Sequence, residues 1–327
     1  NSSNIVYSGQ DTYVNYTGSQ NELGGIDPGR GGLSSPQGIT YNLSNFWITG
    51  GTSIAVFNNS GSAISGGFDI TFQIFTSIKD ITTNGSDFWI VPSTAAGLDY
   101  IYHINISGGN ITGTPGLVGG IDLTKAYSSA INAAGITMNG SDFWITDINS
   151  DYIFHFNSSG DNITGTPGLV GGFSARSANP SVIPNGITMN GSDFWISDGN
   201  ADYVYHFDAF GNNITDGFST RSAYSSTINL RGIETNKNHL NKGAPNDFWV
   251  VDNAGTWTFH FKGAVQEQGV NGNTTSHNVT VALTDDINYF WRVKAIDGSQ
   301  ESNYVYGTFT VNTRAPSSPE NLQPSTG

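Results

Sequence analysis

The chain has 327 residues, no cysteine and a formal net charge of −14 at pH 7, and only 12% of its residues are charged. The absence of cysteine excludes a disulfide framework and thiol chemistry. The acidic balance argues against a nucleic-acid partner, and no apolar run reaches the ~20 residues that span a bilayer, so we expect no membrane insertion. The sequence begins with Asn1, which we interpret as a processed N-terminus, although a trimmed chain would look the same.

A Phe-Trp pair recurs through most of the sequence. The spacings between successive pairs are 42, 55, 51 and 54 residues, and the pairs are Phe46-Trp47, Phe88-Trp89, Phe143-Trp144, Phe194-Trp195 and Phe248-Trp249. A period of about 40 to 50 residues built from short strands is typical of β-propeller blades with four strands each. No apolar pattern at i, i+3, i+4 and i+7 supports helical repeats. The predicted fold class is therefore all-β.

Residues 1–30 match part of a repeat. The segment 5–9 followed by 12–17 matches the later Phe-Trp strand, turn and aromatic strand, and Gly24-Gly25-Ile26-Asp27 matches Gly66-Gly67-Phe68-Asp69. The chain is therefore expected to enter the fold in the middle of a blade. Propellers often close by building one blade from both chain ends, which removes exposed strand edges.

Five further repeats follow, over residues 38–75, 80–122, 135–174, 186–219 and 232–262. Each combines a short strand, a polar turn of the Asn-Gly-Ser kind, an Asp-Phe-Trp-Ile strand, an aromatic strand and a Gly-rich outer segment. Five full repeats and one split repeat predict a six-bladed propeller over residues 1–262. A five-bladed ring is the alternative.

Residues 263–313 differ from the repeats. The segments 278–283, 289–298 and 308–313 resemble the last three strands of a fibronectin type III domain, with Tyr289-Phe290-Trp291-Arg292 as the most specific part. A complete domain of that type needs seven strands and about 90–100 residues. We therefore predict a partial immunoglobulin/fibronectin III-like β-sandwich module. The alternative is that Phe290-Trp291 marks a sixth Phe-Trp repeat.

Residues 314–327 form a Pro- and Ser-rich extended tail. It is either a disordered tail or stub of a longer protein, or a strand donated to the incomplete module of a neighbouring copy. A head-to-tail contact of this kind that does not close gives a filament. The candidate assembly residues are Pro319, Asn321, Leu322 and Pro324.

Fourteen Asn-X-Ser/Thr sequons are present, which predicts a protein with covalent N-linked glycans that is extracellular, either secreted or on the cell surface. Chance in a chain rich in Asn, Ser and Thr explains part of this number. The positions of the remaining sequons argue against chance, because several lie five residues before the Trp of a repeat and several others follow the aromatic strand. The sequons begin at Asn1, Asn15, Asn42, Asn58, Asn84, Asn105, Asn110, Asn139, Asn157, Asn162, Asn190, Asn213, Asn273 and Asn278.

Two D-x-N-x-D segments are candidate calcium loops, because alternate oxygen ligands at this spacing can surround the ion. The residues are Asp147, Asn149 and Asp151, and Asp198, Asn200 and Asp202. Both segments also fall where a turn is required, and Asp and Asn are ordinary turn residues.

The other polar repeat positions indicate no catalysis. His103, His155, His206 and His260 alternate with aromatic residues, so we expect them to pack between blades. The strand nearest the propeller axis carries one carboxylate, Glu234, among threonines. A single carboxylate cannot form a paired acid–base site, so we predict that the protein is not an enzyme. The threonines are Thr40, Thr82, Thr137 and Thr188.

The period, the Phe-Trp pairs and the aromatic-His-aromatic strands of residues 1–262 resemble the NHL-like and YWTD-like β-propeller families. Such families include lactonases, lyases, receptor ectodomains and scaffolds, so the resemblance implies a fold and leaves the function open. With the sequons and the fibronectin-like segment, the chain resembles secreted surface proteins of microbes.

Three functional hypotheses follow. The first is an extracellular structural glycoprotein, the repeating subunit of a surface filament or coat, whose partners are other copies of itself. The second is a carbohydrate- or ligand-binding adhesin propeller. The third is a secreted propeller lyase or lactonase that uses the axial tunnel near Glu234.

Overall fold

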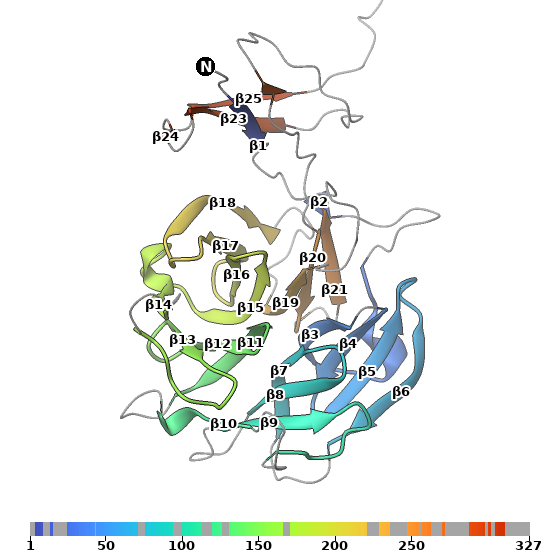
Figure 1. Cartoon of the computed structure of the whole chain (residues 1–327). Helices are drawn as coiled ribbons and strands as arrows, with labels where there is room; N and C mark the ends of the chain where they lie inside the picture. Colours follow the sequence, from blue (N-terminus) through green and yellow to red (C-terminus); the bar gives the residue numbers. More distant parts are fainter. Residues whose placement is uncertain are drawn as a thin grey trace, which may run out of the picture. The chain divides into compact units, whose positions relative to one another are not determined.

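The fold is described from a computed structural model of the chain (Figure 1). The structure describes residues 25–42, 44–70, 76–93, 100–112, 120–125, 131–165, 171–220, 229–235, 247–254 and 257–262, together with the backbone of strands at 4–8, 14–15, 270–271, 288–297, 300–301 and 305–310. The chain divides into two compact units, Tyr13–Gly263 and a second unit of Asn1–Thr12 with Ala264–Gly327. Each unit is described by itself.

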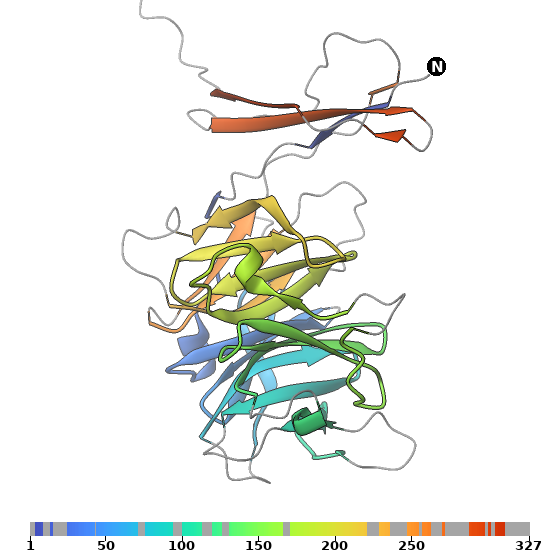
Figure 2. The same cartoon turned by 90° about the vertical axis from the view of Figure 1, so that its left-hand side faces the viewer.

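The larger unit contains five four-stranded antiparallel sheets among its described residues (Figure 1 and Figure 2). Blade 1 consists of β3 (Pro36–Asn42), β4 (Asn45–Gly50), β5 (Ser53–Asn58) and β6 (Ala63–Asp69). Blade 2 consists of β7 (Ser77–Thr83), β8 (Asp87–Ser93), β9 (Tyr100–Asn105) and β10 (Ile121–Asp122). Blade 3 consists of β11 (Ala133–Asn139), β12 (Asp142–Asp147), β13 (Tyr152–Phe156) and β14 (Phe173–Ser174). Blade 4 consists of β15 (Pro184–Asn190), β16 (Asp193–Asp198), β17 (Tyr203–Phe207) and β18 (Asn213–Ser219). Blade 5 is β19 (Leu230–Thr235), β20 (Asp247–Asp252), β21 (Trp257–Lys262) and β2 (Val14–Asn15).

The propeller prediction is confirmed, but the six-blade prediction is wrong and the five-bladed alternative is correct. The repeat at 232–262 supplies only the three inner strands of its blade, and β2 supplies the fourth by pairing with β21. Ile26 continues this outer strand with a bridge to Thr258. The N-terminal segment therefore completes the fifth blade and does not begin a sixth. As predicted, the ring closes with strands from both ends of the repeat region.

The Phe-Trp pair holds neighbouring blades together. In each blade the Trp ring packs at a tilt against the Phe of the next blade, because residues i and i+1 of a strand point to opposite faces of its sheet. Ring centroids are 4.5 to 5.4 Å apart, and the final contact, Trp249 on Phe46, closes the circle. Tilted packing at this separation is favourable for aromatic rings. The five contacts are Trp47–Phe88, Trp89–Phe143, Trp144–Phe194, Trp195–Phe248 and Trp249–Phe46.

The repeated histidines pack as predicted, and their ring partner is a tryptophan. In four blades the imidazole stacks on the indole of the neighbouring strand, with centroids 3.9 to 4.2 Å apart and planes within 12°. In two of these blades a ring nitrogen of the histidine also contacts a carboxylate. There Nε2 lies 3.2 Å (His155) and 3.0 Å (His206) from the Asp that begins the Asp-Phe-Trp motif. Blade 1 has Val56 at this position, opposite Trp47.

The second unit contains a five-stranded sheet with the order β22-β1-β23-β24, and β25 also pairs with β23. Its strands are β22 (Val270–Asn271), β1 (Asn4–Ser8), β23 (Asn288–Asp297), β24 (Gln300–Glu301) and β25 (Val305–Thr310). The assignment of residues 5–9 to a propeller repeat is therefore wrong, because β1 pairs with β22 and β23. Phe290-Trp291 lies in β23 and is not a sixth blade motif.

Other predictions for the C-terminal region lie outside the described residues. They concern the strand at 278–283, the sequons at Asn1, Asn273 and Asn278, and the tail at 314–327 with its four candidate assembly residues. The described strands form one sheet, so a fibronectin III-like sandwich stays a prediction. Among the described residues, no helix has the length and apolar character needed to cross a bilayer.

Candidate functional site

The two ends of the propeller axis are chemically different, and the topology decides which residues reach each end. In every blade the first and third strands run in the same direction, because neighbouring strands are antiparallel. The turns that follow these two strands therefore lie on one face of the ring. We call this the sequon face, because these turns carry the glycosylation sequons, and the opposite side the sequon-free face.

All eleven sequons between residues 15 and 213 map to the sequon face. Four of them end or directly follow the first strand of a blade: Asn42, Asn84, Asn139 and Asn190. Six lie in or beside the connection from a third to a fourth strand: Asn58, Asn105, Asn110, Asn157, Asn162 and Asn213. Asn15 stands opposite Phe261 near the end of the third strand of blade 5, at the same face. None of the ten asparagines from Asn42 to Asn213 is buried.

The side chains of several sequon asparagines organise their own turns. Oδ1 of Asn58, Asn84, Asn105 and Asn157 accepts N–H groups two to four residues ahead, at 2.8 to 3.0 Å. The glycan attachment atom, Nδ2, takes no part in these hydrogen bonds. Asn42 differs, because its Nδ2 donates to the Gly85 carbonyl of the next blade at 2.8 Å.

Glu234 stands at the axis on the sequon-face side, as predicted. Its Oε2 accepts from the Thr40 hydroxyl of blade 1 at 3.1 Å, and its Oε1 from the Thr188 hydroxyl of blade 4 at 3.0 Å. The Thr235 N–H also donates to Oε1, at 2.8 Å. Glu234 therefore ties its own blade to both neighbours and lines a cavity of about 390 Å³. This supports the interpretation of Glu234 as a hydrogen-bonding residue.

Asp80 was not identified from the sequence, although aligning the repeats would have revealed it. It occupies a position of the innermost strand that is glycine in the other four blades. The carboxylate is buried, and its Oδ2 accepts the Ile136 N–H of blade 3 at 2.9 Å. Burial raises the pKa of Asp80 well above its usual value, against the lowering effect of nearby backbone N–H groups, and the charge of Glu234 raises it further.

We expect the pH dependence of stability to report on Asp80. The unfolded pKa is about 3.9 and the folded pKa is higher, so between the two the folded state holds a proton that the unfolded state has lost. The free energy of unfolding should fall as pH rises through this window, by up to about 1.4 kcal/mol per pH unit. Asp80→Ala removes this contribution without creating a sequon before Thr82, so the variant should gain stability relative to the wild type with rising pH.

Urea titrations of both proteins from pH 4 to pH 7 test this prediction. The exposed Asp161→Asn variant is the control for loss of one carboxylate. Burial also raises the pKa of Asp198, but that residue is present in both proteins and cancels in the comparison. Parallel curves for the wild type and Asp80→Ala would show that the buried carboxyl does not titrate in this range.

The two predicted calcium loops lie on the sequon-free face, and their described contacts are those of turns. Asp147 Oδ1 accepts the N–H groups of Asn132 and Asn149, at 2.9 and 3.1 Å. Asp198 Oδ1 accepts those of Ile183 and Asn200, at 3.0 and 2.9 Å. No group of three or more His, Cys, Asp or Glu side chains arranged to hold a metal occurs among the described residues. Calcium binding there stays a prediction.

Asp151 and Asp202, the last acidic residues of these loops, have φ angles of +55° and +49°. Asp151 pairs with Arg176, whose Nε and Nη2 lie 2.8 and 2.7 Å from its Oδ2. The backbone carbonyl of Asp202 accepts a hydrogen bond from the Thr220 hydroxyl at 2.9 Å. These left-handed positions suit Asp, which tolerates this conformation better than most residues.

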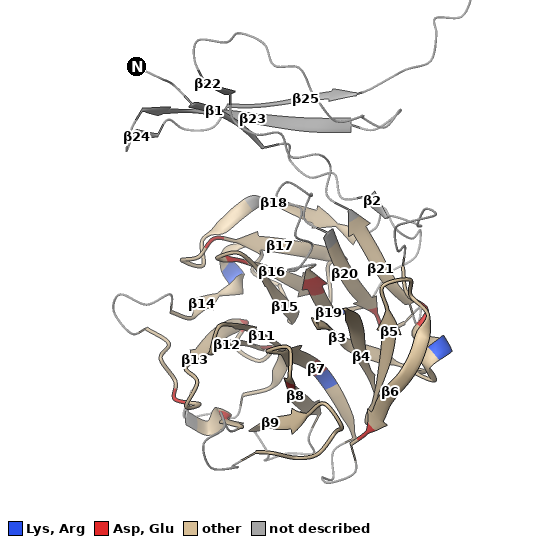
Figure 3. Cartoon of the chain, turned by 45° about the vertical axis from the view of Figure 1, so that its right-hand side comes forward, with Lys and Arg blue, Asp and Glu red and all other residues tan. Residues whose placement is uncertain are grey.

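A basic pocket that was not predicted from the sequence lies at the axis on the sequon-free face. It has a volume of about 240 Å³, and its charged lining residues are Lys79 and Arg231. Basic residues are rare on the described strands of the ring, and β7 carries one of the blue segments in Figure 3. Lys79 and Arg231 lie one position before Asp80 and the axial glycine Gly232, so the repeat alignment contains the signal, but nothing in the sequence shows that they meet.

Solved structures of several β-propellers resemble this chain. A glutaminyl cyclase from Myxococcus xanthus aligns with a TM-score of 0.50 at 12% identity, over 71% of this chain and 91% of the cyclase. The cyclase and this chain share the β-propeller fold. A catalytically inactive virginiamycin B lyase from Staphylococcus aureus, solved with quinupristin, gives 0.41 at 16% identity, over 70% of this chain and 66% of the lyase. The calcium-binding protein regucalcin from Agrobacterium tumefaciens gives 0.40 at 11%, over 72% and 94%.

The chain and these solved structures share the β-propeller fold, as the sequence predicted. No protein-family model matches the sequence, and no curated protein matches it either. At these identities the likeness shows the fold alone, and the similar proteins include both enzymes and non-enzymes.

Proposed function

We propose that the protein is an extracellular structural glycoprotein, the repeating subunit of a surface filament or coat. One observation carries the proposal: every sequon of the propeller's described residues maps to one face of the ring, and the opposite face has none. A glycan is bulky and must face solvent. Chance placement would scatter sequons over the loops of both faces. One glycan-covered face and one bare face suit a subunit that contacts its neighbours on the bare side.

The low charge of the chain supports glycosylation. Only 12% of residues are charged, about half of the ordinary share, so N-linked sugars would supply the hydration that ionic side chains usually provide. Turn residues such as Asn58 and Asn84 suit glycan attachment at Nδ2, because their hydrogen bonds in the turn use Oδ1.

The second unit supports assembly by strand addition. β1 stands between β22 and β23, so a strand remote in sequence can enter this sheet through main-chain hydrogen bonds. The proposed donation of the tail around Leu322 to a neighbouring copy would use the same chemistry. A head-to-tail contact that does not close gives a filament.

Glycopeptide mass spectrometry of the native protein tests the glycan distribution. We expect attached glycans at sites on the sequon face such as Asn58, Asn84, Asn139 and Asn157, because their turns are exposed. Asn42 should show lower occupancy, since its Nδ2 contacts the neighbouring blade. Unmodified peptides at all of these sites would contradict the proposal.

Negative-stain electron microscopy tests assembly, and the chain offers a matched pair of variants. Pro180→Ala converts Asn179-Pro-Ser into a sequon on the sequon-free face, where residue 180 is exposed. Its glycan would replace the hydrogen bond that Asn179 Nδ2 donates to the Tyr205 hydroxyl at 2.9 Å, so occupancy must be measured first. Asn84→Gln removes one from the sequon face. We expect filaments or sheets from the native protein and from Asn84→Gln, and isolated particles from Pro180→Ala once mass spectrometry confirms its extra glycan. Monodisperse native particles would refute the coat proposal.

A further inference from the structure

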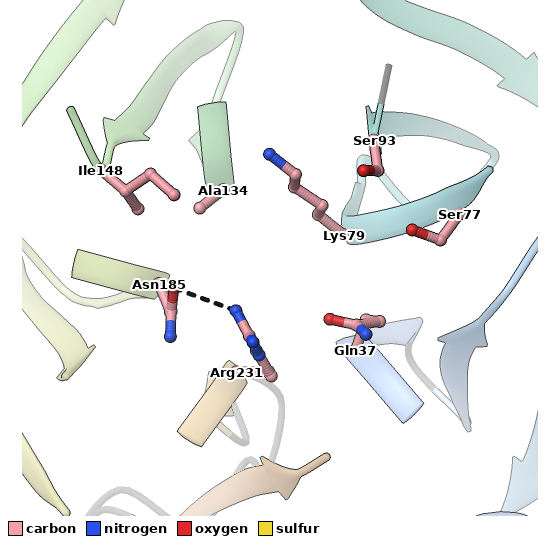
Figure 4. Close-up of a pocket in the computed structure, with 8 residues that line it drawn as sticks. All are labelled: Gln37, Ser77, Lys79, Ser93, Ala134, Ile148, Asn185 and Arg231. Atoms are coloured by element: carbon pink, nitrogen blue, oxygen red, sulfur yellow. Dashed lines mark hydrogen bonds between the residues drawn. The ribbon is translucent and has the colours of Figure 1, made fainter. Parts of the chain in front are cut away.

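The mouth of the axis on the sequon-free face is built by all five blades. Each innermost strand places one residue around it, and Figure 4 shows these side chains converging from separate strands: Gln37, Lys79, Ala134, Asn185 and Arg231. Ser77 and Ser93 add hydroxyl groups at the rim. No carboxylate is among the described lining residues. In a chain of net charge −14, a pocket whose charged groups are both cationic is exceptional and points to an anionic ligand.

Arg231 is held in place without a charge partner among the described residues. Its Nη1 donates to Asn185 Oδ1 at 3.4 Å, while its Nε is buried and has no described hydrogen-bond partner. Asn185 is itself buried, and its Nδ2 donates to the Leu230 carbonyl at 2.7 Å, which orients Oδ1 toward Arg231. Burial lowers the pKa of the Arg231 guanidinium, yet arginine stays protonated at neutral pH.

Lys79 is positioned in part by uncharged groups. Its Nζ donates to Asn132 Oδ1 at 2.7 Å and to the Ala133 carbonyl at 2.8 Å. These bonds fix the ammonium group at the mouth and leave its positive charge in place. Lys79 and Arg231 bring two positive charges from different blades to one mouth of the axis, which makes an anion the ligand of best electrostatic fit.

We propose that this pocket binds the carboxylate of a small acidic sugar, of the size of a hexuronate. The planar guanidinium of Arg231 matches the geometry of a carboxylate, and the amides of Gln37 and Asn185 with the serine hydroxyls suit sugar hydroxyl groups. The volume of about 240 Å³ lies below that of pockets for drug-sized ligands, which indicates a monosaccharide unit. The pocket lies on the face without sequons, so the protein's own glycans would not cover it. The proposal does not depend on the coat function.

Isothermal titration calorimetry of the full glycosylated chain tests the site with three probes: glucuronate, glucose and sulfate. We expect glucuronate to bind at least tenfold more tightly than glucose, which lacks the carboxylate, and more tightly than sulfate, which lacks the planar fork. Arg231→Gln should weaken glucuronate binding by at least tenfold, since it removes the guanidinium. Arg30→Gln is the matched control, because Arg30 is an exposed arginine outside the pocket, and its affinity should equal that of the wild type.

Thermal melts of each variant accompany the titrations, and Lys79→Gln provides a second loss of charge should Arg231→Gln fail to fold. Absence of glucuronate binding to the wild type, or equal binding to Arg231→Gln or to a folded Lys79→Gln, would overturn the site. Equal affinity for glucose or tighter binding of sulfate would overturn the carboxylate assignment. None of these outcomes bears on filament formation, so the two proposals fail separately.

Discussion

Gly186→Ala should destabilise the propeller by about 3 kcal/mol or more. Gly186 lies on the innermost strand of blade 4, where a Cβ would overlap the Arg231 carbonyl oxygen and lie 2.9 Å from the Gly232 Cα. Both neighbours are backbone atoms of the next innermost strand, so no side chain can rotate away. The five innermost strands form a closed ring, and opening one contact disturbs its neighbours on both sides.

Gly51→Ala is the control for this variant. Gly51 has a φ of +59°, and a Cβ added there would have no other atom within 4 Å, so the substitution should cost only about 1–2 kcal/mol from the left-handed backbone. Chemical denaturation of both variants measures the difference. If Gly186→Ala were no less stable than Gly51→Ala, the close approach of the innermost strands would be wrong.

Trp195→Ala should cost about 3–5 kcal/mol of folding free energy. The side chain is 1% exposed and makes contacts in two directions. It stacks on His206 in its own blade, with centroids 3.9 Å apart, and packs on Phe248 of blade 5 at 4.5 Å. The substitution leaves a large void between two blades, and the rigid strands around it can collapse only in part.

Phe210→Ala provides the control, because Phe210 is an aromatic residue of the same blade that is 81% exposed. Its effect should stay within about 0.5 kcal/mol. Differential scanning calorimetry compares the two variants with the wild type. A melting temperature for Trp195→Ala equal to that of Phe210→Ala would contradict the role assigned to the Trp–Phe contacts between blades.

The sequence by itself determined the repeat unit and the strands within it. The spacing of Phe194-Trp195 and its equivalents, the alternation around them and the polar turns before them are local signals, and these strands form where predicted. The outer-strand motif at Ile26 was also recognised, because it repeats Phe68 and its equivalents. The blade number was misjudged because two partial repeats look like two incomplete blades until pairing shows that β2 completes the sheet of β21.

Only the tertiary structure decided which residues meet. Strand direction brings the turn after a first strand and the turn after a third strand to one face, so sequons as far apart as Asn42 and Asn213 share it. Closure of the ring likewise brings Lys79 and Arg231 to one mouth of the axis. The physical reason is that a strand's neighbours are set by hydrogen bonding and packing across the ring, whereas sequence patterns report only the local alternation of buried and exposed positions.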